Sequence, residues 1–203
     1  MHITIEPPIL YFGTPVVLIS TLNPDGSPNL APMSSAWALG RHVMLGLGTS
    51  SQTFANLEQT RECVLNVPSD DLWAAVERLA PLTGRSPVPN FKLAYGARFE
   101  RRKFEAAGLH PVNATCVRPP CVSECPLQLE ARVRTIHRIG DDDALAGVEA
   151  EVVAVHGDEH IVGEDRRHVI PDRWRPLIYN FRHYYGLGPE LGRSFRATGA
   201  DGS

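Results

Sequence analysis

Short apolar runs separated by tight-turn signals dominate the first fifty residues, and they restrict the chain to folds rich in antiparallel strands. Residues 16–21 (VVLIST) are apolar and mostly β-branched, which is typical of a strand. Residues 23–26 (NPDG) predict a turn, because proline presets its own φ and glycine can take a positive φ. Residues 27–39 then predict the second strand of a hairpin, and residues 42–47 predict a third strand.

Two prolines indicate where that second strand lies. Pro28 and Pro32 have no N–H group to donate to a neighbouring strand. Proline within a sheet is confined to edge strands and bulges. We therefore expect the strand over residues 27–39 to lie at a sheet edge or to bulge locally.

Helices and further strands follow in the rest of the chain. Residues 49–51 are helix-capping types and predict a helix over 52–59; a strand over 63–67 and a helix over 71–80 come next. Residues 81–98 are rich in proline and glycine, and a short helix is expected over 99–107. Strands are predicted over 127–139 and 147–156. Six or seven strands with two or three short helices favour a mainly β fold, a closed antiparallel barrel with helices outside.

The composition is that of an ordinary soluble domain. Apolar residues make up 43% and charged residues 21%, and the formal net charge is −3. We expect one domain over residues 1–190, with 81–110 as an excursion and 191–203 as a flexible tail. A nucleic-acid binder would need a basic stripe, which is lacking. No apolar run approaches the ~20 residues of a membrane span, and the first residues lack a signal-peptide pattern, so a cytoplasmic location is expected.

The cysteines and histidines do not show the spacing of a metal site. Cys116, Cys121 and Cys125 have intervals of four and three residues and no second pair elsewhere, so reduced thiols are expected. His156 and His160 flank a Gly-Asp-Glu turn, which a hairpin explains without a ligand. We predict no metal.

Two segments are suited to binding a flat, phosphorylated ligand. Residues 29–35 (NLAPMSS) put small side chains into an apolar strand, which lets a ring approach the backbone. The alternative is that Ser34 and Ser35 are merely outward-facing strand residues. Residues 48–53 (GTSSQT) join a strand to a helix start, where free N–H groups favour phosphate. The alternative there is simple helix capping.

Several short motifs follow one another in a fixed order. They are residues 16–21 (VVLIST), 25–34 (DGSPNLAPMS), 53–57 (TFANL) with Thr60, 63–68 (CVLNVP), 103–104 (KF) with 107–109 (AGL), and 119–120 (PP) with 124–126 (ECP) and Glu130. In this order, over about residues 10–190, they resemble the flavin reductase-like, FMN-binding split-barrel family.

The resemblance implies a six-stranded antiparallel Greek-key barrel, a homodimer, and FMN near the subunit interface. The family's ring-contacting strand corresponds to Asn29, Ala31, Pro32, Met33, Ser34 and Ser35, and its phosphate loop to Thr49, Ser50, Ser51 and Thr53. Many members have a basic residue and an Asp just before that threonine, where this chain has Ser51 and Gln52. We therefore expect weaker phosphate binding, or help from Arg85, Lys92 or Arg98.

The expected activity also follows from the resemblance. It implies an NAD(P)H:flavin oxidoreductase that uses FMN, takes NADH or NADPH as co-substrate, and supplies reduced flavin or electrons to a partner such as a flavin-dependent monooxygenase. Hydride transfer on a flavin needs no catalytic side chain, although His183 and Tyr185 are candidates. Tyr185 is expected to cover the ring, unless the aromatic tail only anchors the C-terminus. An FMN-containing oxidase or oxygenase of a small organic substrate and a non-enzymatic FMN electron carrier stay open as alternatives.

Overall fold

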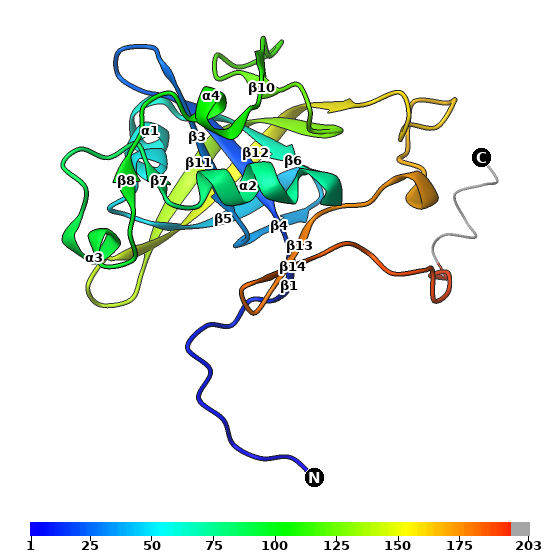
Figure 1. The fold of residues 1–203 in the computed structure, drawn as a ribbon. Helices are drawn as coiled ribbons and strands as arrows, with labels where there is room; N and C mark the ends of the chain where they lie inside the picture. Colours follow the sequence, from blue (N-terminus) through cyan, green and yellow to red (C-terminus); the bar gives the residue numbers. More distant parts are fainter. Residues whose placement is uncertain (196–203) are drawn as a thin grey trace.

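A seven-stranded antiparallel sheet forms the body of the protein in this computed structural model, which describes residues 1–195. The strands lie in the order β3, β2, β6, β11, β12, β5, β4 (Figure 1). Their bounds are β2 Val17–Leu22, β3 Pro28–Met33, β4 Ala36–Leu39, β5 His42–Gly48, β6 Glu62–Val67, β11 Leu127–Ile139 and β12 Leu145–Gly157. The prediction of a mainly β fold is confirmed, with one strand more than the six expected.

The sheet curls around an apolar interior because its strands alternate inward and outward side chains. Val43, Leu45 and Leu47 of β5 are buried, whereas the residues between them are at least partly exposed. Phe54 and Leu57 of helix α1 (Gln52–Thr60) belong to the same core cluster. They are three positions apart and therefore share one helix face. This packing fixes α1 against the barrel.

The barrel is split rather than closed, and the split lies where the ligand segments were expected. β3 and β4 are the two edges of the sheet and are not paired with each other. Ser34 and Ser35 separate them, so the single strand predicted over 27–39 is in fact two. The expected edge position of the proline-containing β3 is confirmed. A strand with two prolines cannot complete a second hydrogen-bond ladder, which is why the expectation of a closed barrel was wrong.

A second layer of short elements packs over β3. They are η1 (Asp70–Leu72), α2 (Trp73–Leu79), β7 (Leu82–Thr83), α3 (Asn90–Leu93), β8 (Arg98–Phe99), α4 (Lys103–Ala107), β9 (Pro111–Val112) and β10 (Cys121–Val122). The helix expected over 99–107 begins only at Lys103, because β8 pairs in parallel with β7. A second core cluster joins α2 and α4 to Leu30 of β3. No helix within residues 1–195 combines the length and hydropathy needed to cross a membrane.

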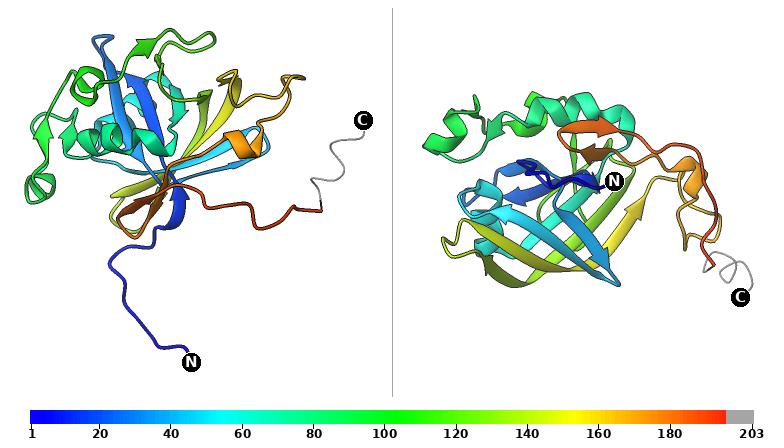
Figure 2. Two further views of the ribbon diagram at one scale, coloured as in Figure 1. Left: turned by 45° about the vertical axis from the view of Figure 1, so that its right-hand side comes forward. Right: turned by 90° about the horizontal axis from the view of Figure 1, so that it is seen from below.

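Segments near the two ends of the chain pair in a small three-stranded sheet below the barrel. Its strands are β1 (Phe12–Pro15), β13 (Ile178–Asn180) and β14 (His183–Tyr185), and η2 (Pro171–Arg173) precedes them. The first residues extend away from the body as an arm (Figure 2). Of the tail predicted over 191–203, residues 196–203 lie outside the described part of the chain.

One buried carboxylate, that of Glu130, holds the loop of residues 115–117 through hydrogen bonds. Glu130 of β11 is fully buried and accepts hydrogen bonds from the backbone N–H groups of Thr115 (2.7 Å) and Val117 (2.9 Å) and from His156 Nε2 (2.6 Å). Burial raises the pKa of Glu130, but these hydrogen bonds outweigh it and lower the pKa to about 2. His156 therefore has a structural partner, consistent with the prediction that it needs no metal.

Candidate functional site

A buried polar network joins β2, β3 and α1. The Asn29 amide donates to Thr21 Oγ1 (3.2 Å) and to Thr53 Oγ1 (3.1 Å). The Asn56 amide donates to the same Thr21 oxygen (2.9 Å), and Gln52 Nε2 donates to Asn56 Oδ1 (2.8 Å). Thr21, Asn29, Thr53 and Asn56 are all buried. The network holds β2, β3 and α1 in one fixed arrangement.

The network leaves one acceptor unused. Asn29 Oδ1 is buried and has no hydrogen-bond partner. A Cβ atom at Gly84 would lie 2.7 Å from this oxygen and 3.2 Å from Gln52 Cγ, so only glycine lets the loop after β7 approach so closely. A buried acceptor without a partner is costly, and its usual explanation in a native protein is a missing donor.

A largely buried cation lies on α4, which packs against the strand that carries Asn29. Lys103 begins α4, is only 3% exposed, and its side chain makes no hydrogen bond or ion pair within the described residues. Phe104 and Leu30 belong to one core cluster and α4 contacts β3, so Lys103 lies on a helix that packs against β3. Burial, helped by the charge of Lys92, lowers the pKa of Lys103 to about 8. Lys103 Nζ is not among the fully buried atoms that lack a partner, so the ammonium keeps some contact with solvent, but a charge desolvated to this degree would be stabilised by an anion.

The predicted phosphate loop is only partly assembled around this position. Thr53 contacts Asn29, and Ser51 caps α1 by accepting from the backbone N–H of Phe54 (3.1 Å). Thr49 instead donates its hydroxyl to the carbonyl of Ala144 (3.2 Å), on the loop between β11 and β12. Ser50 is half-buried in the turn between β5 and α1. Of the basic residues expected to assist, Lys92 is close enough to lower the pKa of Lys103, and Arg85 is close enough to lower the pKa of Lys92.

The other end of β3 leads into a cavity. Ser34 is buried, and the carbonyl of Ser35 accepts from the N–H of Gly46 (2.7 Å), which lets β5 approach because a Cβ there would clash with Ser35. Ser35 Oγ also donates to Tyr11 Oη (3.2 Å). A cavity of about 570 Å³ opens here, lined by residues 7–11, Thr14 and Ser35. Ala31, Pro32 and Met33, on β3, are half-buried between the two ends.

The cavity contains a second orphaned polar atom. Thr14 Oγ1 is buried without a partner, and within residues 1–195 only it and Asn29 Oδ1 have this status. The strand from Asn29 to Ser35 spans roughly 20 Å at the usual rise per residue. Unsatisfied polar atoms thus lie near both ends of the segment from Asn29 to Ser35, which we call the path along β3.

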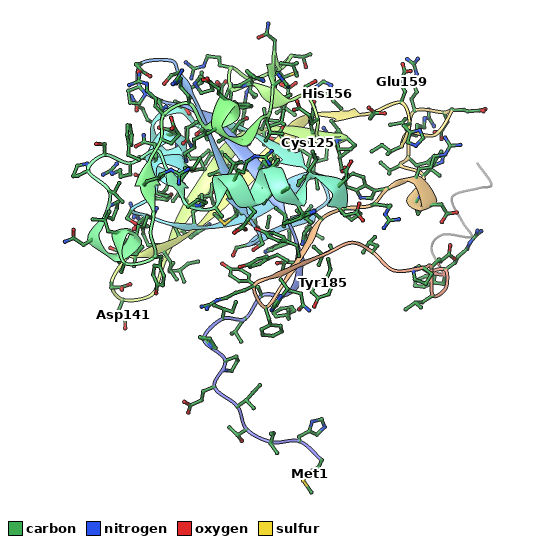
Figure 3. The ribbon with its side chains drawn as sticks, in the orientation of Figure 1. Met1, Cys125, Asp141, His156, Glu159 and Tyr185 are labelled. Atoms are coloured by element: carbon green, nitrogen blue, oxygen red, sulfur yellow. The ribbon has the colours of Figure 1, made fainter. Side chains whose placement is uncertain are left out.

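Tyr185 lies apart from this path. It and Tyr184 line a separate cavity of about 580 Å³, together with Asp70, Asp71 and Trp73. Figure 3 shows Tyr185 at the lower end of the body, near the base of the N-terminal arm. Tyr179 bridges Tyr184 and Tyr11, with ring centroids 5.5 and 5.6 Å apart, so the aromatic tail anchors the small sheet. His183 is exposed on β14.

Sequence reasoning did not find several residues of this site. Gly84 had no distinguishing local pattern, and Thr21, Asn56 and Lys103 were noticed only as parts of the motifs. Tyr11 and Thr14 come from a segment that carried no signal at all. What could have pointed to Lys103 is its place directly before the apolar Phe104, on the inner face of a short helix.

Comparisons with known proteins agree with the split-barrel fold. The family model "Flavin reductase like domain" matches residues 9–188. The uncharacterized protein YdfE of Bacillus subtilis (strain 168) is 44% identical over 193 residues, which cover 95% of this chain and 93% of that protein. The solved structure of flavoredoxin of Desulfovibrio vulgaris (Miyazaki F) has a TM-score of 0.78 at 22% identity, covering 98% of this chain and 100% of that one. Nitrilotriacetate monooxygenase component B from Bacillus cereus has a TM-score of 0.73 at 19% identity, covering 92% and 89%. Because the family model spans most of the chain and the split barrel agrees with it, the chain belongs to the flavin reductase-like family, as its motifs predicted.

Proposed function

We propose that the protein is an NAD(P)H-dependent flavin oxidoreductase that binds FMN along β3. The observation that carries this proposal is the orphaned Asn29 Oδ1 on β3, together with the almost wholly buried Lys103 on α4, a helix that contacts the same strand. The end of the path at Asn29 has no anion and no hydrogen-bond donor for Asn29 Oδ1. A phosphate would supply the anion, and a ribityl hydroxyl would supply the donor. The other end is a cavity large enough for a ring system.

The residues at the phosphate end fit the mononucleotide. Lys103 would form a charge-assisted pair with the phosphate, and the N-terminus of α1 would add N–H donors and a favourable dipole. Ser50 and the hydroxyl of Thr53 would complete the cradle. Asn29 Oδ1, as an acceptor, suits a ribityl hydroxyl rather than the phosphate itself.

The residues at the ring end hold and orient the flavin. β3 has no second neighbour, so its free edge exposes backbone groups from Ala31 to Met33 to the polar rim of a ring. Ser34 and Ser35 continue this edge, and Thr14 Oγ1 offers a further polar contact. When bound, the flavin supplies two-electron redox chemistry with a nicotinamide as hydride donor. The side chains need only to position the two rings, so no acid or base is assigned.

An anaerobic visible spectrum of the FMN-loaded protein tests the activity. We expect NADH or NADPH to bleach the flavin bands within seconds. Bands that persist with both nucleotides would overturn the reductase assignment. An oxidase or oxygenase would then show turnover of a small organic substrate without nicotinamide, and an electron carrier would show neither reaction.

Two partners belong to the same proposal. We propose a homodimer, because β4 is an open edge strand and carries the exposed apolar side chains of Trp37 and Leu39. We also propose that reduced flavin or electrons pass to a separate oxygenase. Nitrilotriacetate monooxygenase component B, by its name one part of an oxygenase system, supports this with its similar fold.

A further inference from the structure

The cavity beside Tyr185 lies where η1 and α2 meet the β13–β14 hairpin. Its volume is about 580 Å³, and it shares no lining residue with the cavity at Ser35. Its lining consists of two aspartates, three aromatic residues, Leu177 and Gly186. We call this space the Tyr185 cavity. Its walls combine negative charge with aromatic rings, a pairing that the proposed flavin site does not use.

Contacts between distant segments fix the walls of the Tyr185 cavity. The Asp70 N–H donates to the carbonyl of Arg175 (2.9 Å), and the Leu177 N–H donates to the carbonyl of Pro68 (3.1 Å). A Cβ atom at Gly186 would collide with the Asp70 carboxylate, so glycine lets the end of the hairpin approach η1 closely. Leu177 is buried and forms an apolar wall. The cavity is therefore a built feature of the fold.

Two carboxylates at this cavity have no cationic partner. Asp70 is paired with Arg175 (3.0 Å). Asp71 forms no ion pair within residues 1–195. Glu77 of α2 accepts from the Tyr184 hydroxyl (3.0 Å) and likewise forms no ion pair in that part of the chain. Acidic residues also suit the start of a helix, so these charges alone do not indicate a ligand.

The aromatic side chains provide the second, independent observation. Trp73 and Tyr185 line the cavity and yet are each 52% exposed, so their rings are accessible from it. The third ring, that of Tyr184, is held by its hydrogen bond to Glu77 and by Tyr179, whose ring centroid is 5.5 Å away. The face of an aromatic ring attracts a cation, and tryptophan does so most strongly.

The chemistry of the walls selects one class of ligand. An anion would be repelled by the excess of carboxylates. A neutral apolar molecule would cover those carboxylates without pairing them, which is costly. A bare ammonium is strongly hydrated and gains little from ring faces. An ammonium that carries alkyl groups is matched by both features, because its charge pairs with the carboxylates and its alkyl groups contact the rings.

We propose that the Tyr185 cavity binds a small organic cation with an alkylated ammonium group. The ammonium would lie against the rings of Trp73 and Tyr185, with Asp71 as its counter-ion. The cavity is separate from the path along β3, so this inference goes beyond the proposed function and does not depend on it.

An NMR titration with choline tests the inference without measuring activity. Choline carries a trimethylammonium group, and 3,3-dimethylbutan-1-ol is its uncharged isostere. We expect choline to bind at least about tenfold more tightly than this alcohol. Its methyl signal should move upfield, because protons above an aromatic face are shielded. Ethanolamine, which lacks the methyl groups, should bind at least about threefold more weakly than choline.

Substitutions in the cavity locate the binding site. Trp73→Leu and Asp71→Asn should each weaken choline binding by about tenfold. Both side chains are exposed, so both variants should fold and keep the FMN affinity of the unmodified protein. Tyr95→Leu removes an exposed ring from the segment between α2 and α4, and Asp141→Asn removes an exposed carboxylate from the loop between β11 and β12 (Figure 3). These two controls should leave choline affinity unchanged.

The outcomes separate this inference from the proposed function. Choline that binds no more tightly than the alcohol or ethanolamine, or that is weakened equally by the control variants, would overturn the cation site. Displacement of bound choline by FMN would also overturn it, because the cavity would then belong to the flavin site. Weaker choline binding in Trp73→Leu and Asp71→Asn alone would support it. An unmodified protein that binds choline but no FMN would overturn the proposed function and leave the cation site standing.

Discussion

Lys103 brings an almost wholly buried positive charge into the fold, and an anionic ligand would stabilise that charge. Its side chain is almost wholly buried and has no hydrogen-bond or ion-pair partner within residues 1–195, so desolvation of its charge opposes the stability of the ligand-free protein, while the same charge would attract a phosphate. Polar groups that oppose stability in this way are common at functional sites. The hydrocarbon part of the side chain still packs, so methionine can replace it with little change in shape.

We therefore expect Lys103→Met to stabilise the ligand-free protein and to weaken FMN. The free energy of unfolding should rise by roughly 2 kcal/mol, because a pKa held near 8 opposes folding of the charged form. FMN affinity should fall to that of riboflavin, which lacks the phosphate. Urea unfolding and calorimetry measure the two effects, with the exposed Arg102→Met as control. A variant that loses stability and keeps its preference for FMN would exclude Lys103 from the site.

The pH dependence of FMN affinity gives an independent test of the same residue. Below pH 8 Lys103 is protonated in the free protein, so affinity should be constant between about pH 7 and pH 8. Above pH 8 binding must also return a proton to Lys103, and FMN affinity should fall by up to about tenfold per pH unit. Riboflavin affinity should stay flat over this range. An FMN profile parallel to that of riboflavin would contradict the prediction.

At the scale of elements, local sequence patterns were enough to predict a strand wherever one of its faces is buried. β5 alternates cleanly, β11 and β12 alternate over part of their length, and the positions of all three could be predicted within a residue or two. The break at Ser34–Ser35 could not, because it depends on Gly46 of β5 bonding to the Ser35 carbonyl. The pairing of β7 with β8 likewise joins residues sixteen positions apart, Leu82 with Arg98, and has no local signature.

β11 also shows how one residue can hold a distant loop. Glu130 binds the backbone of residues 115–117, so Glu130→Gln should lower the free energy of unfolding at pH 7 by about 2–4 kcal/mol. Because its folded pKa lies below the ordinary value, the carboxylate contributes stability that is lost as pH falls from about 4.5 to about 2. The variant should lack that acid dependence in urea titrations at pH 7, 4 and 3. The exposed Glu159→Gln serves as control, and equal effects of the two would contradict the assignment.

At the scale of the molecule, the site is a product of topology rather than of any one motif. Asn29, Thr53 and Lys103 come from β3, α1 and α4, and the excursion between α2 and α4 brings the last of them into place. The motifs singled out the segments of Asn29 and Thr53, which the resemblance assigns to the ring strand and the phosphate loop, and that assignment stays a prediction. They did not indicate that Tyr185 and Thr49 face elsewhere, because side-chain direction there depends on partners more than ninety positions away along the chain, such as Asp70 and Ala144.

The open edge at β4 has a consequence for the whole molecule. Trp37 is 59% exposed on a strand with one free side, and an apolar edge of this kind associates with another chain unless it is covered. We expect light scattering to give the mass of a dimer at micromolar concentration, and Trp37→Glu to shift it toward the monomer, because a buried unpaired carboxylate opposes association. Trp73→Glu is the matched control, since Trp73 is 52% exposed but lies on α2 beside the second cavity. If the unmodified protein is monomeric, or if Trp73→Glu dissociates it and Trp37→Glu does not, the interface lies elsewhere than at β4.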